Sequence, residues 1–347
     1  MMGKLGFGVI SASNMGKAHM ETIKTLDSAQ LRGICDIDKE RLNSAAKEFG
    51  GVATYTDYRE ILQRDDIDAI IVATPDQLHA EHTIGSLEAG KHVLCEKPMA
   101  LTLEDCKAMV DSAEKTGNKL MIGQICRYAP GFMITKRLID EGEIGELFFV
   151  ESEYAHDYSR IPGVGGWRIE PVKLRHPIIG GGCHAVDLLR WIAGDPFEVT
   201  AYANRKVLRQ WPVDDCTVAI MRFPNDVIGK VFTSVGCKRA YTMRSVFYGD
   251  KGTIIADNHS PFITIYKDQY KQGEQLFTRV PDQKISMNYP VSINSHNIVA
   301  EIGEFIDIIK QDLPVLTDGR QGAATVAVCL AAVESAAKGK SVKVKYI

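Results

Sequence analysis

The chain has 347 residues, of which 45% are hydrophobic and 24% are charged, as is usual for globular proteins. This length predicts two domains that are each large enough to bury a core. The 41 Lys and Arg residues nearly balance the 44 Asp and Glu residues, giving a net charge of −3, and no basic stripe is present. We therefore expect no nucleic-acid partner and no anionic membrane surface as a partner.

Neither a membrane span nor a disulfide framework is predicted. No run approaches the roughly 18 apolar residues that a bilayer requires, and the first residues lead directly into a strand instead of a signal peptide. The eight cysteines include no C-x-x-C pair, which argues against a zinc ribbon, a redox motif and a secreted scaffold. We expect a cytoplasmic protein.

The first 125 residues alternate apolar strands with amphipathic helices. Strands are expected at 5–10, 30–35, 69–73, 92–95 and 120–123, and helices at 16–26, 39–49, 79–89 and 103–115. Thr102 and Asp105 form an Asp variant of the capping box at the start of the last helix. Apolar strands separated by helices require right-handed crossovers and a parallel sheet covered on both faces. Residues 1–125 are therefore predicted to be a doubly wound Rossmann domain.

The pattern changes after residue 125, where long β-type stretches are joined by turns such as Pro224-Asn225-Asp226. Residues 126–347 are predicted to form an α+β domain for substrate binding and oligomerisation, with a large, mostly antiparallel open sheet. Helices are expected at 130–141, 183–193, 296–310 and about 320–337. The last helix is apolar over much of its circumference, so we expect it to pack between layers.

A nucleotide-binding turn is predicted where the first strand leads into the first helix. There Ser11-x-Ser13-x-x-Gly16 occupies the G-x-G-x-x-G frame, and Asn14 and Met15 belong to the same turn. Serine keeps the side chain small and adds a hydroxyl that can reach a phosphate. By itself the segment is equally well interpreted as an ordinary strand–helix turn.

Asp36 favours the nucleotide interpretation. It follows the second strand, 20 residues after Gly16, where a carboxylate accepts hydrogen bonds from the adenosine ribose. A carboxylate there repels a 2′-phosphate, and no Arg or Lys except Lys39 follows immediately in the sequence. NAD is therefore predicted as the cofactor in preference to NADP.

Two further loops end strands at the carboxyl edge of the predicted parallel sheet, where ligands bind. One contains Thr74, Pro75 and His79, and the other contains Glu96 and Lys97. We expect these residues to contact the cofactor, and Lys97 to contact the substrate as well. The alternative is that the prolines only punctuate turns and that Lys97 is an ordinary solvated lysine.

The run TPDQLHAEHTIGSLEAGKHVLCEKPMA, residues 74–100, resembles the signature of the Gfo/Idh/MocA family of glucose-fructose oxidoreductases and inositol dehydrogenases. The segments VISASNMGKAH and AAVESAAKGKSVKV support the resemblance. It implies a Rossmann domain followed by an open-sheet domain, NAD(P) as hydride carrier, and a sugar, polyol or sugar acid as substrate. It also places the lysine of the E-K-P motif, here Lys97, beside the nicotinamide and the substrate hydroxyl, where an ammonium can polarise the oxygen.

A second match begins at Gly180 and contains His184 and Asp187 in an H-x-x-D-L motif. The family uses this histidine near the reacting hydroxyl, and an imidazole is suited to accept that proton. The alternative is a histidine that caps the helix and is held by Asp187. Many members carry an aspartate where this chain has Gly180, so either His184 works without that carboxylate or another group replaces it.

The remaining candidates are polar and aromatic. Tyr128, His156, Trp167, Arg168 and Asp187 are expected at the substrate, and a loop over residues 163–168 is expected to lie across a sugar. Further candidates to replace the missing carboxylate are Asp157, Tyr158, Arg175 and His176. A surface or subunit-contact loop is the alternative.

Arg127 is expected at the cofactor, with an interdomain ion pair as the alternative. The residues His156, Asp157, His176 and His184 were also considered as metal ligands. Their spacing matches no compact motif, so no metal is predicted.

The main functional hypothesis is an NAD-dependent oxidoreductase that acts on a CH–OH group of a sugar, polyol or sugar acid, with Lys97 and His184 as catalytic residues. The alternatives are an NAD-retaining glycosidase or lyase that acts through a transient keto-sugar, with or without a metal, and a non-catalytic NAD-binding protein.

A homodimer or homotetramer is also predicted, because an open sheet exposes a broad apolar face. The residues expected on this face are Phe148, Val150, Val218, Ile220 and Phe232.

Overall fold

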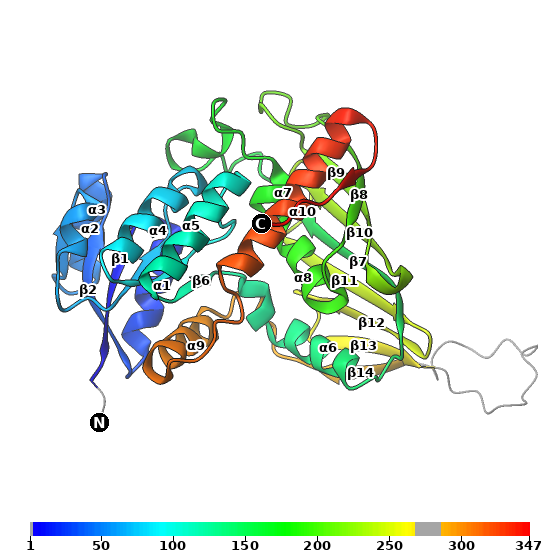
Figure 1. Ribbon diagram of the computed structural model, residues 1–347, viewed down its shortest axis with the longest axis horizontal. Coiled ribbons are helices and arrows are strands. Elements are labelled where there is room, and N and C mark those ends of the chain that lie inside the picture. Colours follow the sequence, from blue (N-terminus) through cyan, green and yellow to red (C-terminus); the bar gives the residue numbers. More distant parts are fainter. Residues whose placement is uncertain (1–2, 268–285) are drawn as a thin grey trace, which may run out of the picture.

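Two β-sheets form the two halves of the molecule in the computed structural model, which describes residues 3–267 and 286–347 (Figure 1). The first sheet has the order β3-β2-β1-β4-β5-β6, and all of its pairings are parallel. Its strands are β1 Leu5–Ile10, β2 Ala29–Cys35, β3 Ala53–Tyr55, β4 Ala69–Val72, β5 His92–Cys95 and β6 Leu120–Ile122. This is the Rossmann order, as predicted. The sequence analysis missed the three-residue edge strand β3, which is too short for a periodic pattern.

Helices cover both faces of the Rossmann sheet. They are α1 Asn14–Thr25, α2 Lys39–Glu48, α3 Tyr58–Leu62, α4 His79–Glu88 and α5 Leu103–Thr116. The predicted cap of α5 forms, since the Thr102 hydroxyl accepts a hydrogen bond from the Asp105 N–H at 3.1 Å. A helix from the far end of the chain, α9 Ile298–Gln311, packs with α1 and buries Phe305 and Ile306 in the Rossmann core.

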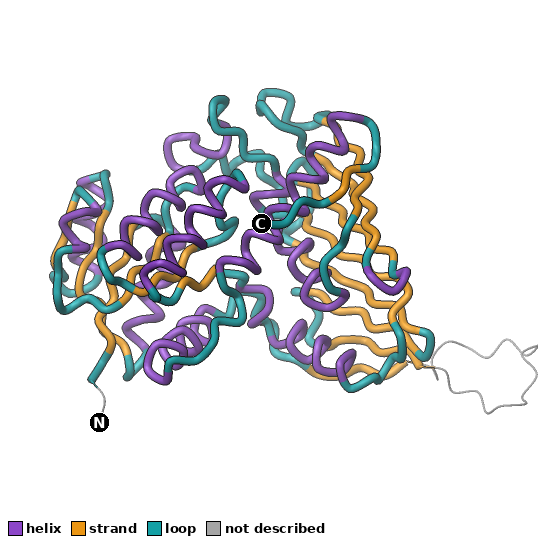
Figure 2. The backbone as a smooth tube through the Cα atoms, in the orientation of Figure 1, coloured by secondary structure: helices purple, strands orange, loops and turns teal. Residues whose placement is uncertain are grey.

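The second sheet has nine strands in the order β14-β13-β12-β11-β7-β10-β9-β8-β15. Its strands are β7 Leu147–Ala155, β8 Glu198–Asn204, β9 Cys216–Arg222, β10 Ile228–Ser234, β11 Thr242–Gly249, β12 Gly252–Asp257, β13 Phe262–Lys267, β14 Ser286–Pro290 and β15 Val342–Lys343. Among the described strands of this second sheet, only the pairing of β7 with β10 is parallel, so the predicted mostly antiparallel sheet is confirmed. Helices α6 Pro130–Asp140, α7 Pro177–Gly180 and α8 Cys183–Ala193 cover one face, and no described helix covers the other (Figure 2).

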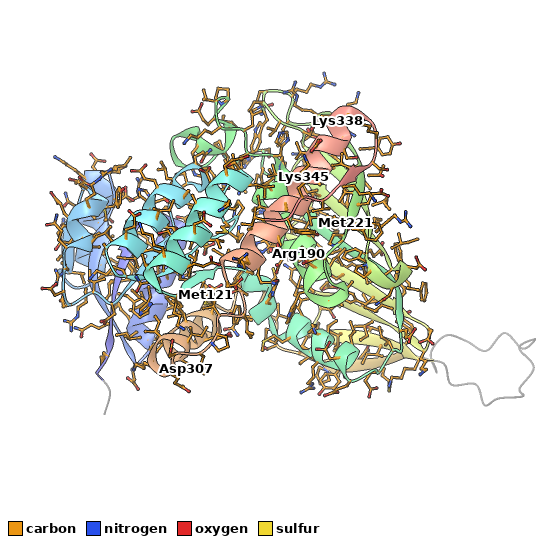
Figure 3. The ribbon with its side chains drawn as sticks, viewed as in Figure 1. Met121, Arg190, Met221, Asp307, Lys338 and Lys345 are labelled. Atoms are coloured by element: carbon orange, nitrogen blue, oxygen red, sulfur yellow. The ribbon has the colours of Figure 1, made fainter. Side chains whose placement is uncertain are left out.

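Helix α10, Gly319–Lys338, runs between the two halves (Figure 1). It packs against α5 and β6 on the Rossmann side and against α8 and β8 on the other, as expected for a helix between layers. A Cβ at Gly322 would lie 2.7 Å from Ile122 Cγ1, so glycine permits this close approach. Arg190 of α8 lies beside α10 (Figure 3) and donates to the Gln321 carbonyl and the Thr325 hydroxyl at 2.9 and 2.7 Å.

None of the described helices is both long enough and apolar enough to span a bilayer.

Candidate active site

The turn from β1 into α1 presents free backbone donors. Ser11 adopts a positive φ of 96°, and a Cβ at Gly16 would lie 1.8 Å from the Ser11 carbonyl oxygen. The Ser13 side chain does not cap α1, so the N–H groups of the first helical turn have no protein acceptor among the described residues. This arrangement fits a pyrophosphate, which accepts from helix N-terminal N–H groups.

Asp36 follows β2 beside this turn, as predicted, but its environment differs from the expectation. Its carboxylate accepts from the Ala12 N–H at 2.8 Å and from Arg41 Nε and Nη2 at 2.9 and 2.6 Å. Burial alone would raise the pKa of Asp36, but the hydrogen bonds from Arg41 and from the Asp38 and Ala12 N–H groups lower it. The relevant cation is therefore Arg41, one helical turn into α2, and not Lys39.

The two edge loops are held together by buried side chains. Glu96 accepts from His19 of α1 at 2.8 Å, and although burial raises the pKa of Glu96, the His19 hydrogen bond and charge lower it to about 2. His79 contacts the carbonyl oxygens of Thr74 and Pro98 at 2.9 and 2.8 Å. Glu96 and His79 thus support the loops, while Thr74 and Pro75 are half-buried at the edge.

Lys97 and His184 come together where the carboxyl edge of the Rossmann sheet meets α8. The His184 side chain is 2% exposed, and neither ring nitrogen has a protein partner within the described ranges. Its ring stacks on Tyr154, with centroids 6.3 Å apart. Burial, followed by the charges of Lys97, His296 and Arg175, places the pKa of His184 well below 6.5. The imidazole is therefore neutral and free to accept a proton.

An aromatic wall adjoins His184. His156 packs against Tyr158 and Tyr241 with ring centroids 5.1 and 5.3 Å apart, and Tyr241 in turn packs against His296 at 5.5 Å. His296 lies 6.1 Å from the His184 ring. Of the residues in this wall, only His156 and Tyr158 were candidates from the sequence. His296 lies at the start of a predicted helix and Tyr241 lies between two predicted strands, so neither was predicted at the site.

The predicted sugar loop folds back across the Rossmann edge. The predicted residues 163–168 form most of η3, Val164–Ile169. In η3 the Trp167 carbonyl accepts a hydrogen bond from Gln77 Nε2 at 2.9 Å. Arg168 lies over the Tyr158 and Trp167 rings at 5.3 and 4.8 Å. These contacts attach the loop to the Rossmann edge and place Arg168 against aromatic rings.

Arg175 occupies the space that a side chain at position 180 would fill. It forms a buried ion pair with Asp76, and a Cβ on Gly180 would lie 1.9 Å from its Nη1 atom. A guanidinium, not a second carboxylate, therefore stands at that place beside His184.

Three predicted contacts are corrected by the structure. Arg127 Nε and Nη2 donate to the Asp187 carboxylate at 2.8 and 2.7 Å, and Thr325 donates to the same group at 3.0 Å. Asp187 is 1% exposed, so both residues anchor α8 instead of binding cofactor or substrate. Tyr128 is also buried, in the Rossmann core beneath α9, because its ring completes that apolar cluster.

No group of three or more His, Cys, Asp or Glu residues within the described parts of the chain is arranged to hold a metal ion. In particular, His156 lies in the aromatic wall and Asp157 pairs with Lys238 at 3.1 Å.

Comparison with known proteins decides the family. Residues 5–124 match the model described as an oxidoreductase family with an NAD-binding Rossmann fold, and residues 132–255 match the GFO/IDH/MocA C-terminal domain. A 1,5-anhydro-D-fructose reductase of Ensifer adhaerens is 30% identical over 259 residues, which are 73% of this chain and 75% of that protein. The chain belongs to the Gfo/Idh/MocA oxidoreductase family.

The similarity to other family members extends over both halves. A myo-inositol 2-dehydrogenase of Thermotoga maritima is 26% identical, with 98% of each chain covered. A levoglucosan dehydrogenase solved with NADH and L-sorbose is 27% identical, with a TM-score of 0.87 and complete coverage of both chains. The predicted family and NAD as the cofactor of the Rossmann domain are confirmed.

Proposed function

We propose that the protein oxidises a secondary hydroxyl of a sugar, polyol or sugar acid and delivers the hydride to NAD. The observation that carries this proposal is a buried His184 that has no hydrogen-bond partner among the described residues and whose pKa is lowered by burial and by the charge of Lys97, at the sheet edge that presents the nucleotide turn. NAD-dependent dehydrogenase relatives support the same chemistry. NAD, when bound, accepts the hydrogen and two electrons that leave the carbinol carbon.

The residues of this chain have separate roles in that reaction. His184 takes the hydroxyl proton, because its lowered pKa keeps it in the basic form. Lys97 donates a hydrogen bond to the oxygen as it becomes a carbonyl and stabilises the charge that develops there. The aromatic wall, together with Tyr154, limits the access of water.

The proposal is tested by incubating the protein with NAD and a panel of sugars, polyols and sugar acids while NADH absorbance and product mass are followed. Stoichiometric NADH and ketone support the dehydrogenase. A cleaved product without net NADH would instead support the NAD-retaining glycosidase or lyase, and NAD binding without product would support a binding protein.

The pH dependence of kcat/KM should report the environment of His184. Because the pKa of His184 is lowered below 6.5, the base form persists as the pH falls from about 8 through 6.5, and activity is lost only in more acidic solution. The His184→Gln variant should react much more slowly, and the pH profile of its residual kcat/KM should lack this acidic limb. A limb centred at or above pH 6.5 in the native enzyme would contradict the assignment.

We also propose a homodimer or homotetramer formed through the face of the nine-stranded sheet that no described helix covers. Strand alternation places Val218, Ile220 and Phe232 on this face, and Ile220 is 41% exposed. Val150 is fully buried in the helix-covered core, so that predicted residue is wrong. Phe148 is 56% exposed and lies at a register shift between β7 and β11.

Light scattering should give an even multiple of the chain mass, and Ile220→Glu should shift the protein to smaller species because it buries a charge in the contact. A native monomer at micromolar concentration would exclude this assembly.

The proposed location remains the cytoplasm, which is supported by eight cysteines that are all unpaired.

A further inference from the structure

Arg175 holds a permanent positive charge inside the site. Its side chain is 4% exposed, its Nε donates to Asp76, and its guanidinium lies over the Trp167 ring at 5.0 Å. Nη1 and Nη2 have no acceptor among the described protein groups. The side chain is thus immobilised by two contacts while two of its nitrogens remain available to a ligand.

The guanidinium packs against Gly180, close enough to His184 for its charge to act on that imidazole. Nη1, Cζ and Nη2 lie 1.9, 2.1 and 2.5 Å from the position of a Cβ on Gly180, which ends α7 just before α8 and His184. The charge of Arg175 contributes to the lowered pKa of His184. Glycine at position 180 is therefore a steric requirement for this placement, because any side chain there would displace the guanidinium.

The carboxyl groups at this edge leave the substrate space without a free negative charge. Asp76 pairs with Arg175, Glu96 accepts from His19, and Asp187 pairs with Arg127. Glu301 is fully buried, and burial and the nearby charge of Glu96 raise its pKa well above the ordinary value, which favours its neutral form. Lys97 therefore has no carboxylate partner among the described residues, and Arg175 keeps two nitrogens without a described acceptor.

We propose that the substrate is a sugar acid whose carboxylate accepts two hydrogen bonds from Arg175 while a nearby hydroxyl lies at His184 and Lys97. This inference rests on the proposed function and names its substrate class. The planar fork of a guanidinium matches the two oxygens of a carboxylate, and a buried bidentate pair gives both affinity and orientation. A neutral polyol would offer Nη1 and Nη2 only uncharged acceptors, which form weaker hydrogen bonds than a carboxylate does.

The test compares matched acidic and neutral compounds, such as gluconate with glucitol and galacturonate with galactose, as substrates with NAD. The native enzyme should prefer the acids by about 100-fold or more in kcat/KM, which corresponds to one or two charge-assisted hydrogen bonds. Arg175→Met should lose that preference, because it removes the guanidinium that is proposed to bind the carboxylate. Arg175→Lys should be intermediate, because it keeps the charge but not the fork.

Two control variants test whether the expected change is specific to the guanidinium of Arg175. Arg160→Met removes an exposed arginine of the same loop and should leave the preference unchanged. The double variant Arg175→Met/Asp76→Asn avoids an unpaired buried carboxylate, and NAD titration by protein fluorescence verifies that each variant is folded.

Calorimetric titration of the native enzyme–NADH complex with gluconate and with glucitol measures the same charge preference without turnover. Tighter binding of gluconate supports the proposal. Equal use of acids and neutral compounds, or an equal loss of both in Arg175→Met, would overturn it while leaving the dehydrogenase intact. If neither class reduces NAD, the proposed function fails, and the calorimetric comparison still decides whether the site selects anions.

Discussion

Replacing Lys97 with methionine should lower kcat by roughly 10²- to 10⁴-fold, the range typical of a positioned acid–base group. Methionine fills a similar volume but cannot donate to the substrate oxygen, so the developing charge loses its stabilising partner. Lys97 is half-buried and has no described acceptor for its Nζ atom. The measurement is steady-state kinetics at saturating NAD and substrate.

NAD affinity separates catalysis from cofactor binding in this experiment. The dissociation constant of NAD for Lys97→Met should stay within about threefold of the native value, because the pyrophosphate turn and Asp36 are untouched. Lys107→Met, which removes an exposed lysine of α5 paired with Asp111, should retain full turnover. Near-native turnover of Lys97→Met would show that Lys97 has no catalytic role and is an ordinary solvated lysine.

Replacing Asp36 with alanine should weaken NAD binding by about 10- to 100-fold and narrow or reverse the preference for NAD over NADP. Each hydrogen bond to a charged group contributes about 1.5–3 kcal/mol, and alanine removes the acceptor proposed for the ribose hydroxyls. It also releases Arg41, which now donates twice to Asp36, to bind a 2′-phosphate. Fluorescence titration with both dinucleotides measures the two affinities.

Arg41 provides the control for this prediction. The double variant Asp36→Ala/Arg41→Ala should bind both dinucleotides weakly and gain nothing for NADP, because the cation that would receive the phosphate is gone. If native protein prefers NADP, or if Asp36→Ala leaves the NAD affinity unchanged, Asp36 does not select the cofactor.

Local patterns were sufficient to predict most of the fold. The limits of β1 and β5 match the expected strands, and α5 begins at the predicted cap, because hydrophobic period and capping chemistry depend on neighbours within a few residues. Arg41 was within reach of the same reasoning, since it lies in the first turn of α2, five residues after Asp36.

Long-range pairing was not predictable in the same way. Asp187 was expected at the substrate, but Arg127, 60 residues away, pairs with it, and Arg175 meets Asp76 across 99 residues. Such partners are chosen by the packing of α8 and the crossing loop against the Rossmann edge, which no periodicity in the sequence encodes.

The sequence by itself determined the Rossmann domain, the antiparallel second sheet, the family, and Lys97 and His184 as candidate catalytic residues, because these depend on short-range patterns and on motifs of neighbouring residues. Only the tertiary structure decided that Arg175 stands in the space left by Gly180, that Tyr241 and His296 wall the site, and that Arg127, Tyr128 and Asp187 belong to the framework. The physical reason is that burial and charge pairing are properties of side chains from distant elements that meet only after the sheets and α10 have packed.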